Sequence, residues 1–166
     1  MRVLYTYAQR DRSIALFLAS LLLSCVLTTK VRAQTETVLY TFTGSSDGGV
    51  PYAGLISDKE GNLYGTSHFA GIQDSGTVYE LKRTATGWQE ITLYEFQGGD
   101  DGAHPSGPLT TDGKGNLYGT TDDAGAGRCG VVFKLAYSHG AWVDSTLYSF
   151  NCGPDGANPW GSVNFD

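Results

Sequence analysis

An internal repeat constrains this chain more than any other feature of its sequence. The hexapeptide Gly61–Thr66, GNLYGT, returns unchanged as residues 115–120, 54 positions later. The same offset relates the Leu-Tyr pairs, the Asp-Gly pairs and three prolines, Pro51, Pro105 and Pro159. A period of this length is typical of propeller blades or solenoid turns rather than of an enzyme core. We therefore expect tandem units at 39–92 and 93–146, followed by a partial unit at 147–166.

The first 33 residues have the order of charge and hydropathy that is typical of a secretory signal peptide. Several arginines precede a mostly apolar run from Ile14 to Leu27, and Val31 and Ala33 are small residues at the two positions that signal peptidase inspects. The sequence predicts cleavage after Ala33 and secretion of residues 34–166. Two alternatives are a lipoprotein anchored through Cys25 and an uncleaved anchor, although the apolar run is short for a span of about 20 residues.

The predicted mature chain is acidic. Residues 34–166 hold six Lys and Arg against sixteen Asp and Glu, a net charge of −10. Such a surface repels phosphate backbones, and no basic cluster compensates for it locally. We therefore expect no nucleic-acid partner, and no membrane contact once the leader has been removed.

Each period contains four extended runs and no convincing helix. In the first unit these runs cover 52–58, 62–67, 76–81 and 88–96. Asp58 and its equivalent Asp112 are predicted to open tight hairpin turns, which a glycine three positions later closes. Gly65 and Gly119 lie inside strands, where glycine is costly unless another backbone approaches closely. In the last run of the second unit, alternation places four side chains on one side, namely Trp142, Thr146, Tyr148 and Phe150.

Four short antiparallel strands per unit, joined by glycine-rich turns, predict an all-β fold of β-propeller-like blades. A β-sandwich is the alternative, but it would not require so strict a period. The strand count gives about two full blades, with an orphan outer strand at Leu39–Phe42 and an orphan inner strand at Trp160–Phe165. Because closed propellers have about four to eight blades, we expect an incomplete propeller. It would belong to a longer gene product or be completed by self-association.

Four segments of the repeat resemble the GloVer-type tandem repeats of "choice-of-anchor" bacterial surface and secreted proteins. They are Leu-Tyr-x-Phe, Asp-Gly-x-x-Pro, Gly-Asn-Leu-Tyr-Gly-Thr and Gly-x-Val-x-x-Leu, and the resemblance covers residues 38–166. It implies secretion and a propeller-like fold, and it carries no established chemistry. The chain departs from that pattern in having few repeats and no evident C-terminal anchor.

Cys129 and Cys152, the only cysteines outside the leader, predict a disulfide in an oxidising compartment. The first unit has Ser75 and Gly98 at the equivalent positions, so the two cysteines occur together or not at all. If they face each other, the hairpin between them has a short loop near 138–141. The register would then pair Val131 with Phe150, Phe133 with Tyr148 and Leu135 with Thr146.

No catalytic constellation stands out. His68, His104 and His139 occupy unrelated points of the repeat, so we expect no metal site and no cofactor. Three acidic turns could offer oxygen ligands to calcium, but they lack the dense spacing of a calcium loop and are interpreted as turns. They are Asp47-Gly48, Asp100-Asp101-Gly102 and Asp155-Gly156.

Variable loops follow the second strand of each unit, at 68–75 and 122–129, and we expect any specificity to lie there. The candidate ligand residues are His68, Asp74, Asp122, Asp123 and Trp160. The leading hypothesis is a secreted, non-catalytic binding or scaffold module for an extracellular glycan or protein. One alternative is a hydrolase or lyase that acts through Asp122, Asp123 and Asp74. Others are a lectin-like module that uses Tyr52 or Trp160, and a purely structural part of a longer surface protein.

Overall fold

The computed structural model describes residues 36–166, and the predicted leader, with Cys25 and the cleavage site after Ala33, lies outside them. Residues Val38–Asp166 form one compact unit. Within the described residues the only helical element is a short 3-10 turn, η1 (Ile72–Asp74). No helix of that part of the chain is long and apolar enough to cross a membrane.

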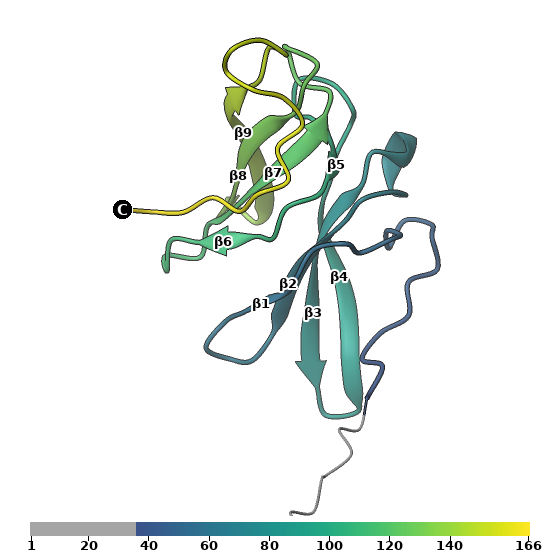
Figure 1. Ribbon diagram of the computed structural model, residues 1–166. Coiled ribbons are helices and arrows are strands. Elements are labelled where there is room, and N and C mark those ends of the chain that lie inside the picture. The colour runs from purple at the N-terminus through teal and green to yellow at the C-terminus, as the bar shows by residue number, and fades with distance from the viewer. Residues whose placement is uncertain (1–35) are drawn as a thin grey trace, which may run out of the picture. The chain divides into compact units, whose positions relative to one another are not determined.

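The first repeat folds into a four-stranded antiparallel sheet, shown in Figure 1. Its strands are β1 (Ile56–Ser57), β2 (Leu63–Ser67), β3 (Thr77–Thr84) and β4 (Gly87–Glu95). They lie in the order β1-β2-β3-β4, so each strand pairs with the next one along the chain. This meander is the architecture of a single propeller-like blade.

The second repeat forms the equivalent sheet, with one additional short strand, β5. The strands are β5 (Ala103–Pro105), β6 (Thr110–Thr111), β7 (Leu117–Asp123), β8 (Val131–Ser138) and β9 (Ala141–Ser149). Both β5 and β6 pair with β7, which pairs with β8 and then β9. Residues 106–109 separate β5 from β6, and the first repeat has the same arrangement, with an isolated bridge between Gly49 and Phe69 ahead of β1. The prediction of an all-β fold of antiparallel, propeller-like sheets is confirmed, with four strands in the first sheet and five in the second.

The predicted outer strand at Leu39–Phe42 is not a strand. The segment nevertheless packs against the first sheet in the same way as its equivalent packs against the second sheet. Phe42 lies edge to face against Tyr79, with ring centroids 4.8 Å apart. Phe96 packs against Phe133 in the same way one period later, at 5.1 Å.

The predicted inner strand at Trp160–Phe165 also makes no strand ladder. The segment, yellow in Figure 1, runs back past β7 and is held there by side chains. The hydroxyl of Thr120 donates to the carbonyl of Gly161 at 3.0 Å, and Phe165 packs edge to face on Tyr118. Contacts of this kind fix the position of the segment without satisfying its backbone groups as a ladder would.

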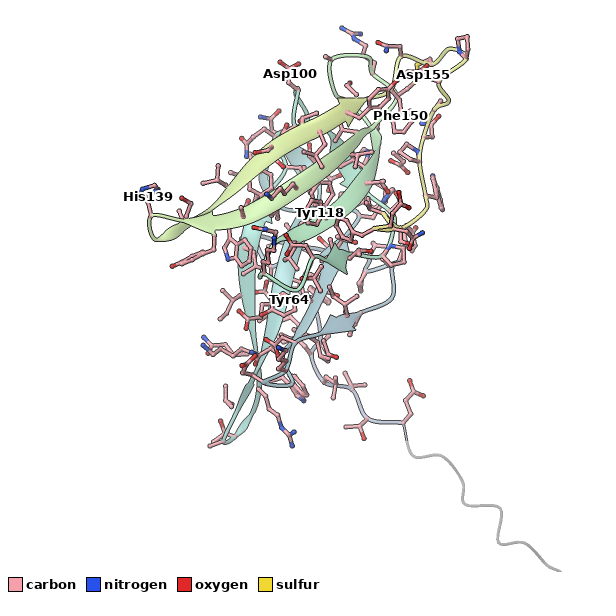
Figure 2. All side chains as sticks on the ribbon, turned by 90° about the vertical axis from the view of Figure 1, so that its left-hand side faces the viewer. Tyr64, Asp100, Tyr118, His139, Phe150 and Asp155 are labelled. Carbon is pink, nitrogen blue, oxygen red and sulfur yellow. A yellow bond between two sulfur atoms is a disulfide. The ribbon has the colours of Figure 1, made fainter. Side chains whose placement is uncertain are left out.

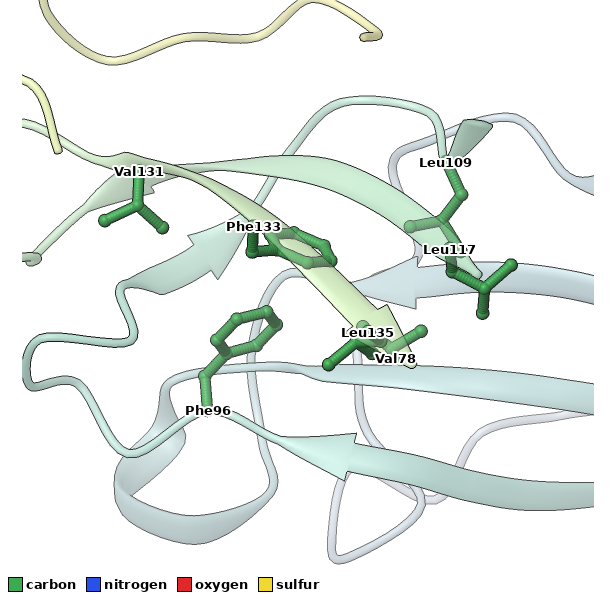
Figure 3. Close-up of a cluster of buried hydrophobic side chains, with 7 residues drawn as sticks. All are labelled: Val78, Phe96, Leu109, Leu117, Val131, Phe133 and Leu135. Atoms are coloured by element: carbon green, nitrogen blue, oxygen red, sulfur yellow. The ribbon is translucent and has the colours of Figure 1, made fainter. Parts of the chain in front are cut away.

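The main hydrophobic core joins the two sheets (Figure 3). Val78 of β3 and Phe96, which directly follows β4, pack with five buried side chains from the second sheet and the segment before it, Leu109, Leu117, Val131, Phe133 and Leu135. Each of these side chains contributes about 1.5–3 kcal/mol through burial. The segment that follows β4 therefore ties one sheet to the next.

Gly65 and Gly119 are covered by aromatic rings and not by another backbone, which corrects our expectation. Across the strands Gly65 pairs with Tyr79 and Gly119 pairs with Phe133. A Cβ added to Gly119 would lie 2.6 Å from Cζ of Phe133. The missing side chain makes room for the ring of the opposite residue, a known way of stabilising glycine in sheets.

The register predicted for β8 and β9 is wrong. From the hairpin end the register is two positions away from the prediction, since Leu135 pairs with Asp144 and Phe133 with Thr146. A bulge between Val132 and Phe133 leaves Leu147 without a partner, so that Val131 pairs with Ser149, one position from the predicted Phe150. The extra residue reverses the alternation of β9. The four side chains predicted on one side, Trp142, Thr146, Tyr148 and Phe150, are therefore divided between two faces.

The loop predicted at 138–141 is confirmed, since Ser138 pairs with Ala141. The disulfide between Cys129 and Cys152 is also present, with Cα atoms 5.4 Å apart. It joins the loop before β8 to the loop after β9, outside the last ladder pair. The disulfide therefore does not determine which residues of β8 and β9 pair with each other.

Candidate functional site

The three acidic turns use their carboxylates within their own loops. The hydroxyls of Tyr40, Tyr94 and Tyr148 donate to Asp47, Asp101 and Asp155 respectively, at 2.9–3.0 Å. The same carboxylates accept backbone N–H groups from Thr43, Gln97 and Asn151. These bonds support the interpretation of the acidic segments as turns.

Asp58 and Asp112 have the role predicted for them, since each opens a hairpin turn and accepts hydrogen bonds from residues that follow it. The side-chain amide of Asn116 donates to Asp112 at 2.6 Å, and backbone N–H groups and Tyr118 donate to the same carboxylate. These bonds, that of Asn116 first, lower the pKa of Asp112 to about 2. A carboxylate so stabilised in its charged form is suited to a turn and not to acid catalysis.

Two histidines and a carboxylate meet where the first repeat joins the second. His68 directly follows β2, His104 lies in β5 and Asp122 lies in β7. One potential ligand atom from each lies within 4.8 Å of the others. Comparison of equivalent repeat positions separates the two histidines and predicts no metal site. This comparison misses the cluster, because the cluster combines non-equivalent positions of two consecutive repeats.

Ser106 lies at the centre of this cluster, which we call the junction cluster (His68, His104, Ser106 and Asp122). Its Oγ is 2.9 Å from Oδ2 of Asp122, 3.3 Å from Nδ1 of His68 and 2.9 Å from the carbonyl of His104. A hydroxyl has one proton, and the charged carboxylate is the strongest of these acceptors. We therefore infer that Ser106 donates to Asp122 and accepts from Nδ1–H of His68. This tautomer leaves the lone pair of Nε2 of His68 available.

Aromatic rings enclose the two histidines. The imidazole centroids are 5.0 Å apart, and Phe69 lies edge to face against both. Tyr52 packs on His68 at 5.1 Å. His68 is only 8% exposed, whereas Tyr52 is 60% exposed, so part of the tyrosine ring remains open to solvent.

Asp123 connects the junction cluster to an open groove. Its Oδ2 lies 3.8 Å from Nδ1 of His104. Asp123 also lines a groove of about 520 Å³, together with Asp100, Arg128 and a glycine- and alanine-rich loop. A volume of this size falls within the usual range for small-molecule sites. Arg128 lies in the predicted variable loop 122–129 but is not among the ligand residues named from the sequence, and neither is Ser106, because no motif distinguishes either residue.

Three of the predicted ligand residues come together at this place, namely His68, Asp122 and Asp123. Asp74 instead accepts the backbone N–H of Ala70 at 2.6 Å within its own loop. Trp160 is 63% exposed, two positions after Asn158, whose side-chain amide donates to the carbonyl of Asp122 at 2.6 Å.

Ser106, His68 and Asp122 are not arranged as a hydrolytic triad. In such a triad the histidine lies between the nucleophile and the carboxylate. Here the serine lies between the histidine and the carboxylate, and it is only 6% exposed. A buried hydroxyl in that position is suited to orienting its neighbours.

Two of the three acidic turns lie toward one end of the second sheet in Figure 2. Asp100 and Asp155 lie toward that end, and His139 lies at the opposite tip of the β8–β9 hairpin. His139 bonds to its neighbour Ser138 at 2.8 Å. It is therefore a histidine remote from the other two.

The fold and the site define a tandem-repeat β protein, in which propeller-like sheets with a common frame carry dissimilar loops. The chain belongs to the Gloeobacter/Verrucomicrobia repeat family, whose family model matches residues 25–165. No match was found among curated proteins or among solved structures.

Proposed function

We propose that this chain is a secreted, non-catalytic binding module of its repeat family, with a polar, hydroxyl-rich ligand such as a glycan. The observation that carries the proposal is the groove of about 520 Å³ beside the variable loop 122–129. The repeat frame is constant between units, whereas this loop differs from its counterpart at 68–75. A constant scaffold with variable loops is the usual arrangement in binding repeats.

The chemistry of the groove supports a polar ligand. Asp100 and Asp123 offer acceptors, Arg128 offers a planar set of donors, and the glycine-rich loop offers exposed backbone groups. A path of contacts then leads through the junction cluster to the open ring of Tyr52. Sugars bind by hydrogen bonds to such polar groups and by stacking on an aromatic ring.

Binding of the full chain to a glycan array, in the presence of a chelator, tests this function. The repeat itself supplies mild substitutions: Tyr52→Ser copies Ser106, and Arg128→Asp copies Asp74, which has nearly the same positive φ. We expect each to weaken binding of the recognised glycan at least about tenfold, equivalent to about 1.4 kcal/mol. Tyr137→Ser is the matched control, since Tyr137 has a similar exposure, 63% against 60% for Tyr52, and also packs on an aromatic ring.

The outcomes separate the alternatives. Equal binding by all four proteins, or no binding to any glycan, would refute the proposed site. Release of shortened glycans by the wild-type chain would support the hydrolase or lyase alternative. Secretion has its own test, because N-terminal sequencing of the exported protein should find Gln34 first, whereas a mature chain that begins at a lipid-modified Cys25 would refute the assignment.

A further inference from the structure

We propose that the junction cluster binds one divalent metal ion of the zinc class, held by His68, His104 and Asp122. Two imidazoles and one carboxylate form a donor set that zinc uses in proteins. This inference does not depend on the glycan proposal, because it rests on the geometry of the cluster and not on the groove.

The three side chains are close enough to form such a site by small rotations. Their candidate ligand atoms all lie within 4.8 Å of one another. Tetrahedral ligands about 2.0–2.2 Å from zinc are about 3.4 Å apart, so closure requires movements of about 1 Å. Three protein ligands would leave a fourth position for water or for a donor atom of a bound ligand.

The backbone that carries each ligand is already fixed. The N–H of His104 donates to the carbonyl of Ser75 at 2.8 Å, and the N–H of His68 donates to Val50 at 3.1 Å. The carbonyl of Asp122 accepts from Asn158. Anchoring of this kind reduces the entropy lost when a metal binds.

The charges around the cluster also favour a cation. Within residues 36–166, the only pairing of a basic side chain with a carboxylate at ion-pair distance is that of His104 with Asp123. The carboxylate of Asp122 therefore has no lysine or arginine beside it. Asp123, beside His104, would serve as an outer carboxylate for a metal-bound imidazole.

The fold does not require a histidine at position 104. Its backbone has φ 57°, and the equivalent residues Val50 and Asn158 have φ 55° and 49°. Two unrelated side chains thus occupy the same conformation in the other repeats. Likewise, position 68 is a histidine in one repeat and the equivalent Asp122 is an aspartate in the next. The backbone conformation therefore does not explain why two histidines and an aspartate meet at this junction, and a binding function can explain it.

Calorimetric titration of the chelator-treated full chain with Zn²⁺ tests the proposal. His104→Asn is the main variant, because Asn158 shows that asparagine fits the backbone at this position. His68→Asn is the second variant. His139→Asn is the matched control, since His139 also has a positive φ (52°) but lies on the remote hairpin tip.

We expect one zinc ion per chain in the wild-type and His139→Asn proteins. In His104→Asn and His68→Asn the affinity should fall by more than the roughly 10- to 100-fold that loss of an outer-shell partner costs. Unchanged affinity in both, or no zinc binding by the wild-type chain, would overturn the proposal.

A second measurement needs no variant. The sequence contains only three histidines, so their imidazole C–H signals can be followed individually by NMR in the wild-type chain. Zinc should shift two of them and leave that of His139 in place. A shift of His139, or of a single histidine alone, would overturn the assignment of the ligands.

Discussion

The two repeats provide an internal experiment on the disulfide. Replacing Cys129 with serine and Cys152 with glycine gives the second repeat the residues that the first repeat has at these positions, Ser75 and Gly98. The folded frame should tolerate this double variant, because the first repeat already forms the same sheet without the bond. Its effect on stability therefore reports mainly on the covalent link.

The expected magnitude follows from the length of the closed loop. The cysteines are 23 positions apart, and closing a loop of this size stabilises a protein by about 3 kcal/mol in the chain-entropy model. Cys152 has φ 60°, a conformation that costs a non-glycine residue about 1 kcal/mol and that glycine adopts freely. We therefore expect the double variant to lose about 2 kcal/mol of unfolding free energy.

Urea denaturation of both proteins, with and without a reductant, measures this difference. The oxidised wild-type protein should be the more stable, and a reductant should lower its midpoint while leaving that of the variant unchanged. Equal midpoints under oxidising conditions would refute the loop-closure argument. Two free thiols in the oxidised wild-type protein would refute the bond itself.

The reverse exchange tests the same reasoning in the first repeat. A Cβ built on Gly98 lies 3.8 Å from Cβ of Ser75, which is the average separation in protein disulfides, about 3.8 Å. Ser75→Cys with Gly98→Cys should therefore form a second disulfide and raise the unfolding free energy by about 2 kcal/mol. Failure to oxidise would show that the two repeats differ in local geometry more than their shared frame suggests.

Two further predictions concern packing and pH. Gly119→Ala should cost about 1–3 kcal/mol in urea denaturation, because its methyl group would meet the buried ring of Phe133, whereas Gly54→Ala, which has open space around it, should be close to neutral. Burial, together with the charge of Asp101, raises the pKa of Asp144 to about 6. The folded state therefore binds this proton more tightly than the unfolded state does, and stability should fall as pH rises from about 4 to about 6. Asp144→Asn should remove this slope in pH-dependent thermal unfolding and stabilise the protein by about 1 kcal/mol at pH 7, a figure reduced for solvent screening. A steeper slope in that variant would contradict the prediction.

Features that depend on neighbouring positions were predictable from the sequence. The Asp58 turn, the hairpin loop at 138–141 and the four-stranded unit all follow from local residue chemistry repeated at a fixed period. The disulfide was predictable because the two cysteines had no other partner in residues 34–166. Each of these predictions needed only residue types and spacing.

The register of β8 and β9 was not predictable in the same way. The bulge that displaces Leu147 leaves no mark in the residue alternation of one strand. A similar irregularity occurs between Val78 and Tyr79 of the first repeat. It is thus a property of the repeat frame that depends on how two strands twist together. Because the disulfide lies outside the strand ladder, the positions of the two cysteines could not reveal the bulge.

The junction cluster shows why a repeat alignment can hide a site. A repeat alignment places His68 opposite Asp122 and His104 opposite Val50. Each pair looks like an ordinary sequence difference between two repeats. In space, however, position 68 of one repeat lies beside positions 104 and 122 of the next. Sequence divergence at position 104 costs the fold little, because the equivalent residues Val50 and Asn158 have nearly the same backbone φ. A tandem protein can therefore build a particular site at one junction while every unit keeps its frame. Candidate sites in such chains are best sought by combining non-equivalent positions of consecutive repeats.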